Sequence, residues 1–357
     1  MSLKSEARGL LKEAENMREI YRILDANFNR AREALRVAED CGRFAMNDPA
    51  ITAMAKNMRS DLQELLNAMP VAEMLVSRDT PGDTGTEISR PTEPLRGGMN
   101  DVLTAACKRL SEALRSIEEY SKIVAPAQSE KIERMRYNGY TLEQRLMAKV
   151  MVARRIVDVK LYALVSSHLC KGSVRETARA AIAGGADAIQ LREKNIPDAQ
   201  LLALAAELRE LTDETGKILI INDRADIAAI VGADGVHLGQ GDLPIAEVRR
   251  LLRPDAVVGR SSHNIEQAKA AVIEGADYVS VGPMFATTTK DRQPVGTGLL
   301  KEALAAVTVP ITPIGGINVG NAAELIALGA QRLAVSSAIC RADDPKAAAA
   351  ALRKLLG

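Results

Sequence analysis

Charged and amide side chains follow an apolar stretch in AIQLREKN, residues 188–195. Gln190, Arg192 and Lys194 occupy alternate positions there, and Glu193 lies between the two cations. Because side chains along a strand alternate between its faces, the first three should share one face and Glu193 the other. Arg192 and Lys194 could then bind phosphate groups, with Gln190 deeper and Glu193 as a structural partner. An ion pair between Arg192 and Glu193 is the alternative.

Two carboxylates follow later apolar runs, Asp223 after residues 218–222 and Asp242 after residues 235–240. Hard oxygen ligands with no His or Cys at comparable positions suit Mg²⁺, which retains water and binds phosphate oxygens. Arg192, Lys194 and Lys290 would add fixed positive charge around the same phosphates. A helix N-cap is the alternative role for Asp242, ahead of LPIAEV.

A second anion site is expected after two further runs, PIGGIN (residues 313–318) and SSAI (residues 336–339). Both segments can present backbone N–H groups, and barrels frequently bind a monophosphate between these two loops. A glycine pair can equally form a plain turn. One metal-bound polyphosphate and one separate monophosphate imply two phosphorylated substrates.

The three histidines are given no catalytic role. His237, within an apolar run, is expected to be a packing residue, and no role is assigned to His168 or His263.

The elements that position these side chains change at about residue 158. Short runs rich in β-branched residues then alternate with amphipathic helices, eight times in about 200 residues. This pattern predicts a (β/α)8 TIM barrel, in which the C-terminal strand ends face the active site. AGGAD, VGADG, EGADY and LGAQR precede strands, and their glycines are expected to end helices in the left-handed conformation. The predicted domains are residues 1–157 and 158–357.

The first 157 residues are predicted to form an all-α helical domain. Leu24, Phe28, Ala31, Leu35 and Ala38 recur at helical spacing and define one apolar stripe, with Glu39 among the charged residues expected on other faces. RAREALRVAED at residues 30–40 resembles RLSEALRSIEE at residues 109–119. Two related helical hairpins or a chance likeness would both explain this. Residues 77–98 are either a linker or an ordered functional loop.

Composition narrows the class of partner. The net charge of +1 argues against nucleic acid or an anionic membrane, and favours small molecules. Four widely spaced cysteines, with no CxxC pair and no signal-peptide pattern, predict reduced thiols in the cytoplasm. A homo-oligomer is compatible with the sequence. The arginines at residues 30, 32, 36 and 43 form a solvated face, or an anion-binding or partner surface.

Six motifs together resemble the thiamine-phosphate synthase family, also called thiamine-phosphate pyrophosphorylase. They are QLREK, INDRADIAAIVGADGVHLGQGDLP, GRSSHN, VGPMFATTTK, PIGGIN and SSAI, in this order over about residues 159–345. The helical half resembles an uncharacterised extension found before some members. The resemblance implies a transferase that joins hydroxymethylpyrimidine diphosphate to thiazole phosphate, giving thiamine phosphate and pyrophosphate.

The resemblance also implies roles for individual positions. Asp223 and Asp242 would hold Mg²⁺, Ser261 would belong to the pyrimidine pocket, and Lys290 would contact the diphosphate. The pyrimidine diphosphate would bind Gln190, Leu191, Arg192, Glu193, Lys194 and Asn222. The thiazole phosphate would bind Thr287, Thr288, Thr289, Gly316, Ser336 and Ser337. Arg192, Lys194, Lys290 and Ser261 form the expected catalytic set.

The residues favour a dissociative substitution. Mg²⁺ and the cations would stabilise charge on the departing diphosphate while the aminopyrimidine delocalises the cation, so neither a Ser–His nor a Cys–His pair is expected. A thiazole tautomerase-like barrel is the alternative, although it would have no diphosphate to bind. In a further alternative the helical half is a regulatory or partner-binding module beside a catalytic barrel.

Overall fold

The computed structural model describes residues 3–46, 48–84, 97–287 and 293–357. The chain divides into two compact units, Met1–Val150 and Met151–Gly357. The sequence predicted a division after residue 157, which is where the last helix before the barrel ends. Each unit is described by itself below. None of the described helices is long and apolar enough to cross a membrane.

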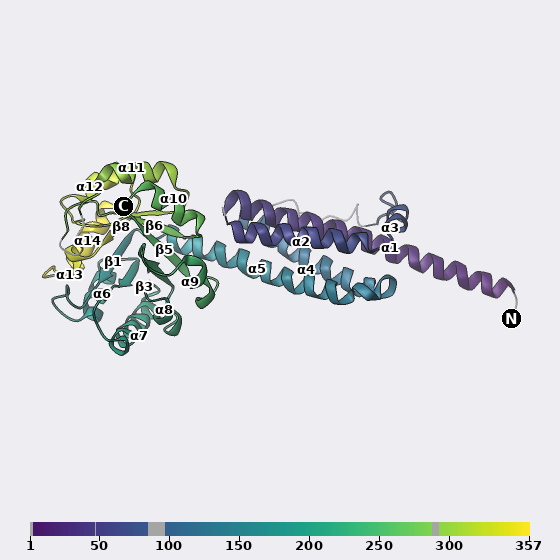
Figure 1. Cartoon of the computed structure of the whole chain (residues 1–357), viewed down its shortest axis with the longest axis horizontal. Coiled ribbons are helices and arrows are strands. Elements are labelled where there is room, and N and C mark those ends of the chain that lie inside the picture. Colours follow the sequence, from purple (N-terminus) through teal and green to yellow (C-terminus); the bar gives the residue numbers. More distant parts are fainter. Residues whose placement is uncertain (1–2, 47, 85–96, 288–292) are drawn as a thin grey trace. The chain divides into compact units, whose positions relative to one another are not determined.

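The first unit is built from helices, as predicted, and Figure 1 draws them in purple to teal. All five residues of the predicted apolar stripe on α1 are buried. Asp48 accepts hydrogen bonds from the Ala50 and Ile51 amides, both at 3.0 Å, and so caps α2 ahead of Pro49. The elements are α1 (Leu3–Asp40), a π-helix (Cys41–Ala45), α2 (Pro49–Asn67), α3 (Val71–Val76), α4 (Met99–Val124), a 3-10 turn (Pro126–Gln128) and α5 (Ser129–Val157).

The sequence repeat has matching ion pairs in its two copies. Glu39 of α1 and Glu118 of α4 hold equivalent positions in the repeat, and each is only 5% exposed. Arg59 of α2 lies 3.0 Å from Glu39, and Arg136 of α5 lies 2.5 Å from Glu118. Each buried glutamate therefore joins its helix to the next, which supports two related hairpins. The expectation that Glu39 lies on an outer face was wrong, because its arginine partner lets it be buried.

The start of the segment 77–98 is tied to α1. Arg78 donates to both carboxylate oxygens of Asp25, at 2.8 and 2.7 Å, and Asp79 lies 4.0 Å from Arg22. These contacts favour a structural role for its first residues. Residues 85–96 lie outside the described residues, so a function for the whole segment stays a prediction.

The second unit is the predicted eight-stranded parallel barrel, with strand order β7-β6-β5-β4-β3-β2-β1-β8. A parallel bridge between Ile314, directly after β7, and Ala334 of β8 closes the ring. Figure 1 shows helices surrounding the strands. The strands are β1 (Leu161–Val165), β2 (Ala188–Leu191), β3 (Ile218–Asn222), β4 (Gly235–Leu238), β5 (Val257–Ser262), β6 (Tyr278–Val281), β7 (Ile311–Pro313) and β8 (Leu333–Val335). The helices are α6 (Val174–Ala183), α7 (Asp198–Thr215), α8 (Ala225–Ile230), α9 (Ile245–Leu251), α10 (Ile265–Ile273), α11 (Thr297–Ala306), α12 (Ala322–Ala327), α13 (Ser337–Cys340) and α14 (Pro345–Leu355).

Alternate residues of each strand enter two different cores. Ile189, Leu191 and Ile221 belong to the apolar layer between strands and helices. Tyr162 and Tyr278 point inward, with Val152 and Ile156 of α5 in the same cluster. The lower part of the barrel is therefore filled with apolar and aromatic side chains, as in barrels of this type.

The predicted glycine turns before strands are confirmed. One glycine of each repeated motif (Gly185, Gly232, Gly275 and Gly329) has φ between 63° and 104°, the left-handed region that favours glycine. In three of these motifs the aspartate before the strand accepts an amide N–H near the start of the preceding strand. These bonds are Leu161 to Asp187 at 3.1 Å, Leu219 to Asp234 at 2.9 Å and Val258 to Asp277 at 2.8 Å. The motif thus fastens neighbouring strands at the end opposite the pocket.

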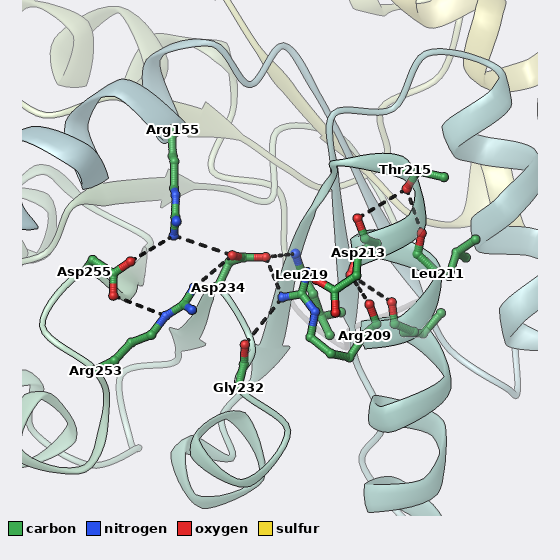
Figure 2. A network of polar contacts seen from close by, with 12 residues as sticks. Arg155, Arg209, Leu211, Asp213, Thr215, Leu219, Gly232, Asp234, Arg253 and Asp255 are labelled. Carbon is green, nitrogen blue, oxygen red and sulfur yellow. Dashed lines mark hydrogen bonds and ion pairs between the residues drawn. The ribbon is translucent and has the colours of Figure 1, made fainter.

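Asp234 has the most cationic surroundings of these three aspartates (Figure 2). Its carboxylate lies 2.7 Å from Arg209, 2.9 Å from Arg253 and 3.5 Å from Arg155, while the side chain is 13% exposed. Asp255 also contacts Arg155, at 3.4 Å. Removing this carboxylate would leave several partly buried guanidinium groups without their central partner.

Asp234→Ala should therefore lower the free energy of unfolding by about 3 kcal/mol, measured by urea denaturation. Asp213→Ala is the matched control, because Asp213 also pairs with Arg209 but is 67% exposed. The control should change stability by less than about 1 kcal/mol. Equal losses in the two variants would contradict a structural role for the Asp234 network.

Candidate active site

A pocket opens at the C-terminal ends of the strands. Several of the side chains predicted to meet there line it, whereas Lys194, Asp223 and Asp242 are not among its lining residues. Among its lining residues are Gln190, Arg192, Asn222, His237, Ser261, His263, Thr287, Gly315, Gly316, Ser336 and Ser337. Thr288, Thr289 and Lys290 lie outside the described residues, so their predicted roles are not tested.

The end of β2 alternates as predicted as far as Arg192. Gln190 and Arg192 line the pocket, whereas Leu191 is fully buried in the apolar layer beneath the helices. The side chain of Leu191 therefore lies outside the pocket, and the predicted binding role of this residue stays a prediction. Glu193 accepts a hydrogen bond from the Ser167 amide at 2.5 Å. This contact fits the structural role that the alternation predicts, and the place of Glu193 in the predicted binding set stays a prediction.

Asn222 and Gln190 line the pocket, and each has one buried polar atom without a hydrogen bond in the described part of the chain. Gln190 is 1% exposed and Asn222 is 7% exposed. Gln190 Oε1 and Asn222 Nδ2 are buried and have no hydrogen-bond partner among the described residues. Leaving such atoms unpaired costs free energy, so the pair marks a place where a polar ligand would supply one donor and one acceptor.

Asp223 is held in an unusual backbone conformation. Its φ of 63° makes it the one described non-glycine residue with positive φ. Its amide donates to the His237 carbonyl at 2.8 Å, and its carboxylate receives a hydrogen bond from Lys194 Nζ. Strain of this kind is retained where the surroundings demand it, often at functional sites. Here it places the carboxylate beside the cation from β2.

Asp242 turns back toward its own loop. Its Oδ2 accepts a hydrogen bond from the Gly239 amide at 2.6 Å. The N-cap residue of α9 is Pro244, and no side chain caps that helix. The N-cap alternative for Asp242 is therefore wrong. Its carboxyl group is instead available to interact with Asp223.

The two aspartates perturb each other. Burial and the neighbouring Asp242 carboxyl raise the pKa of Asp223, although Lys194 acts to lower it. Burial also acts to raise the pKa of Asp242, but hydrogen bonds from Asp223 and the Gly239 amide lower it overall. When two adjacent carboxyl groups share a proton or a cation, the pKa of one is raised and the pKa of the other is lowered in this way.

Few of the described side chains at this place could bind a metal ion, and those that could offer hard oxygen ligands. Asp223 and Asp242 provide carboxylate oxygens, and no group of three or more His, Cys, Asp or Glu side chains forms a metal cluster in the described part of the chain. A cation bound here would complete its coordination with water and ligand oxygens. That composition fits a magnesium ion and does not fit a structural zinc ion.

A chain of hydrogen bonds crosses the barrel beneath the pocket. His237 Nε2 lies 2.9 Å from Ser261 Oγ, and His237 Nδ1 lies 2.9 Å from the Tyr278 hydroxyl. Tyr278 meets Tyr162 at 3.0 Å, and Gln190 Nε2 donates to Tyr162 at 2.7 Å. Sequence reasoning missed this connection and assigned His237 to packing. The signal was the two-residue alternation, which places all five side chains on inward positions.

The expectation that the site has no Ser–His pair was also wrong. Ser261 and His237 are hydrogen-bonded, although they lie on different strands and far apart in sequence. The second ring nitrogen of His237 faces a tyrosine, whereas in hydrolase triads it faces a carboxylate. His263 has its own partner, because its Nδ1 lies 2.6 Å from the Gly282 carbonyl oxygen.

The far side of the pocket is lined by backbone. Gly315 and Gly316 have φ of 100° and 66°. A Cβ on Gly316 would lie 2.5 Å from the Ala286 carbonyl oxygen, so only glycine fits there. Asn321 donates to the Gly316 carbonyl at 2.9 Å and so holds the turn. Ser336 lies directly before the short helix α13, whose first residue is Ser337.

Comparisons with known proteins agree on the barrel. Residues 161–339 match the profile of a family described as thiamine monophosphate synthase. Residues 22–145 match the profile of the ThiD2 family. A solved thiamine phosphate pyrophosphorylase from Pyrococcus furiosus is 37% identical, with a TM-score of 0.52, over 56% of this chain and 95% of that one.

Curated relatives extend the similarity to both units. A thiamine-phosphate synthase from a Nostoc species is 40% identical over 329 residues, covering 91% of each chain. One from Thermosynechococcus vestitus is 41% identical over 331 residues, covering 92% of each chain. These alignments are longer than the barrel, so the relatives share the helical unit as well.

The pKa of the Asp223 carboxyl should fall in Asp242→Asn, because a group that raises it is removed, and should rise in Lys194→Ala, because a stabilising cation is lost. Carboxyl carbon NMR shifts followed against pH measure both changes. Asp343→Asn, at a 98% exposed side chain, is the control and should leave Asp223 unchanged. Shifts in the opposite directions would show that the two carboxyls do not interact as described.

Proposed function

The chain belongs to the thiamine monophosphate synthase family, and we propose how its own residues carry out the reaction of that family. The protein is a transferase that forms thiamine phosphate. We take its substrates to be hydroxymethylpyrimidine diphosphate and thiazole phosphate, which leave as thiamine phosphate and pyrophosphate. The observation that carries this assignment is the Lys194–Asp223–Asp242 cluster beside the unpaired amide atoms of Gln190 and Asn222.

The cationic wall of the pocket would bind the diphosphate. Arg192 lines the pocket and is 8% exposed, so its guanidinium acts in surroundings with little water. Burial lowers the pKa of Arg192, while Asp223 acts to raise it, and an arginine stays charged in either case. Lys194 is about half exposed and can exchange its contact with Asp223 for a phosphate oxygen. Fixed positive charge here stabilises the leaving group most as the C–O bond breaks.

Asp223 and Asp242 would hold Mg²⁺, because they offer two hard oxygen ligands and leave room for water and phosphate oxygens. When bound, the ion would neutralise charge on the diphosphate. Lys194 and Arg192 act on the same oxygens from the side of β2. Asp223 would be a ligand of the cation, and Lys194, which contacts Asp223 in this structure, would bind the substrate.

The pyrimidine would lie above the polar floor of the barrel. Gln190 Oε1 can accept a hydrogen bond from an amino group, and Asn222 Nδ2 can donate one. Ser261 lines the same pocket and offers its hydroxyl. The ring of such a substrate delocalises the positive charge left when the diphosphate departs. The thiazole nitrogen then attacks this carbon, so no protein nucleophile is required.

The thiazole phosphate would bind across the pocket. Gly315 and Gly316 present backbone between β7 and α12, and Ser336 and Ser337 stand at the turn into α13. Barrels commonly bind a monophosphate between these two loops. Thr287 lines the same pocket and would add a hydroxyl. Separate sites for the two anions hold the thiazole nitrogen opposite the leaving group.

The alternatives are less favoured. A thiazole tautomerase would transfer a proton and would leave the carboxylates and the cations of β2 without a purpose.

A regulatory or partner-binding role for the helical unit is compatible with catalysis in the barrel, and stays a prediction. A cytoplasmic setting also stays a prediction, supported by the four cysteines, which are all free thiols. Oligomerisation stays a prediction as well.

Lys194→Ala and Asp223→Asn should each lower kcat by roughly 10²-fold or more, because charge on the leaving group loses its stabilisation. The dissociation constant for thiazole phosphate, measured by calorimetry, should change less than about threefold, since that anion binds on the far side. Lys301→Ala, in α11 and exposed, is the control for lysine loss. Near wild-type turnover in Lys194→Ala would overturn the assignment.

Asp242→Asn should raise the Mg²⁺ concentration needed for half-maximal activity by about tenfold or more, because one of two carboxylate ligands is lost. Binding of Mn²⁺, followed by electron paramagnetic resonance, gives the same comparison without turnover. Asp343→Asn serves as the control. Full activity of the wild-type chain after removal of divalent cations would exclude this role for the two aspartates.

A further inference from the structure

Five side chains form one hydrogen-bonded series across the barrel, called the relay here. It runs from Gln190 through Tyr162, Tyr278 and His237 to Ser261, with donor–acceptor distances of 2.7, 3.0, 2.9 and 2.9 Å. The first four members are between 1% and 5% exposed. Their burial shields the series from water, which strengthens the hydrogen bonds within it.

The direction of every hydrogen in the relay follows from one end. Gln190 Nε2 donates to the Tyr162 oxygen, so the Tyr162 hydrogen points on to Tyr278. The Tyr278 hydrogen then points to His237 Nδ1. Burial raises the pKa of both phenols, so each keeps its single hydrogen. In this direction His237 accepts at Nδ1 and donates from Nε2 to Ser261.

The two ends of the relay meet the pocket with fixed and different polarity. At one end, Gln190 donates one of its two amide hydrogens to Tyr162, and its Oε1 is left as a buried acceptor without a partner in the described chain. At the other end, Ser261 accepts from His237, which leaves its own hydrogen to be donated. The pocket thus offers one acceptor and one donor.

We propose that Tyr162, Tyr278 and His237 are positioning residues that set this polarity, so that the pocket selects an aminopyrimidine over its oxo counterpart. The inference rests on the proposed function. The amino group of such a ring donates to Gln190 Oε1, and a ring nitrogen accepts from Ser261. An oxo group with a ring N–H has the opposite polarity and would need the Gln190 amide turned over and every relay hydrogen reversed.

The surroundings are shaped to hold the centre of the relay. A Cβ on Gly259 would lie 2.1 Å from Tyr278 Cζ and 2.5 Å from its hydroxyl oxygen, so Tyr278 occupies space that only glycine leaves open. The His237 ring stacks on Tyr278 at 5.5 Å, and the two tyrosine rings meet edge to face at 6.0 Å. The hydroxyl of Tyr278 is therefore fixed between Tyr162 and His237.

The relay also defines what the Ser–His pair does. A general base must carry a free lone pair on the nitrogen facing the serine. His237 carries its hydrogen on that nitrogen, because Tyr278 donates to the other one. Ser261 is therefore a hydrogen-bond donor to the substrate and is not activated as a nucleophile.

The test compares kcat/KM for the 4-amino pyrimidine diphosphate with that for its 4-oxo analogue, at saturating thiazole phosphate. Tyr162→Phe removes the acceptor that orients Gln190, and the amino-over-oxo ratio should fall about tenfold or more. Tyr278→Phe should give a loss of the same size. In the double variant the amino-over-oxo ratio should fall no further than in either single variant, because one substitution already interrupts the series of hydrogen bonds.

The KM for thiazole phosphate should stay within about twofold in these variants, whereas a general loss of structure would change it as well. Circular dichroism and Tm confirm folding, and Tyr137→Phe, at a side chain on the surface of the helical unit, is the matched control. Unchanged discrimination in folded Tyr162→Phe overturns the relay, as do additive losses in the double variant.

Failure of the proposed function gives a different pattern, in which the wild-type chain makes no thiamine phosphate. The relay is then tested by calorimetry with the same two diphosphates. Preference of the wild-type chain for the amino compound, lost in Tyr162→Phe, supports the relay without turnover. Equal or undetectable binding of both compounds by the wild-type chain overturns it.

Discussion

The two-residue alternation of side chains along a strand is the constraint on which this site depends. In β2 it sends Gln190 into the barrel and Leu191 into the apolar layer beneath the helices, and it returns Arg192 to the pocket. A shift of one residue would exchange these faces and bury the cation among aliphatic side chains. The outer layer therefore stabilises the register that also determines which groups face the substrates.

Closure of the barrel turns this alternation into a site with distinct parts. Carboxylates and cations from β2 to β4 gather where a diphosphate would leave, whereas the glycine turn after β7 and the serines after β8 lie across the pocket. The floor between them is the buried relay, whose polarity is set by hydrogen bonds alone. Charge acts at the rim, where it can bind anions, and neutral groups act at depth, where a charge would be costly to bury.

The sequence could predict the barrel and most of the rim, because each strand end is a local pattern and parallel strands bring their C-terminal ends together. It placed Leu191 in the binding set together with its neighbours, since the motif was treated as a continuous segment. It missed Tyr162 and Tyr278, because their partners lie on other strands and depend on distances across the barrel. Glu39 was misplaced for the same reason, as Arg59 comes from another helix.

The central claim is that inward-facing residues of β2 to β5 bind the pyrimidine and its leaving group. A crystal structure with Mg²⁺, pyrophosphate and thiamine phosphate tests it most directly. The account predicts the metal between Asp223 and Asp242, the pyrophosphate against Arg192 and Lys194, and the pyrimidine amino group on Gln190 Oε1. A pyrimidine bound away from Gln190, or pyrophosphate on the side of Gly316, would contradict it.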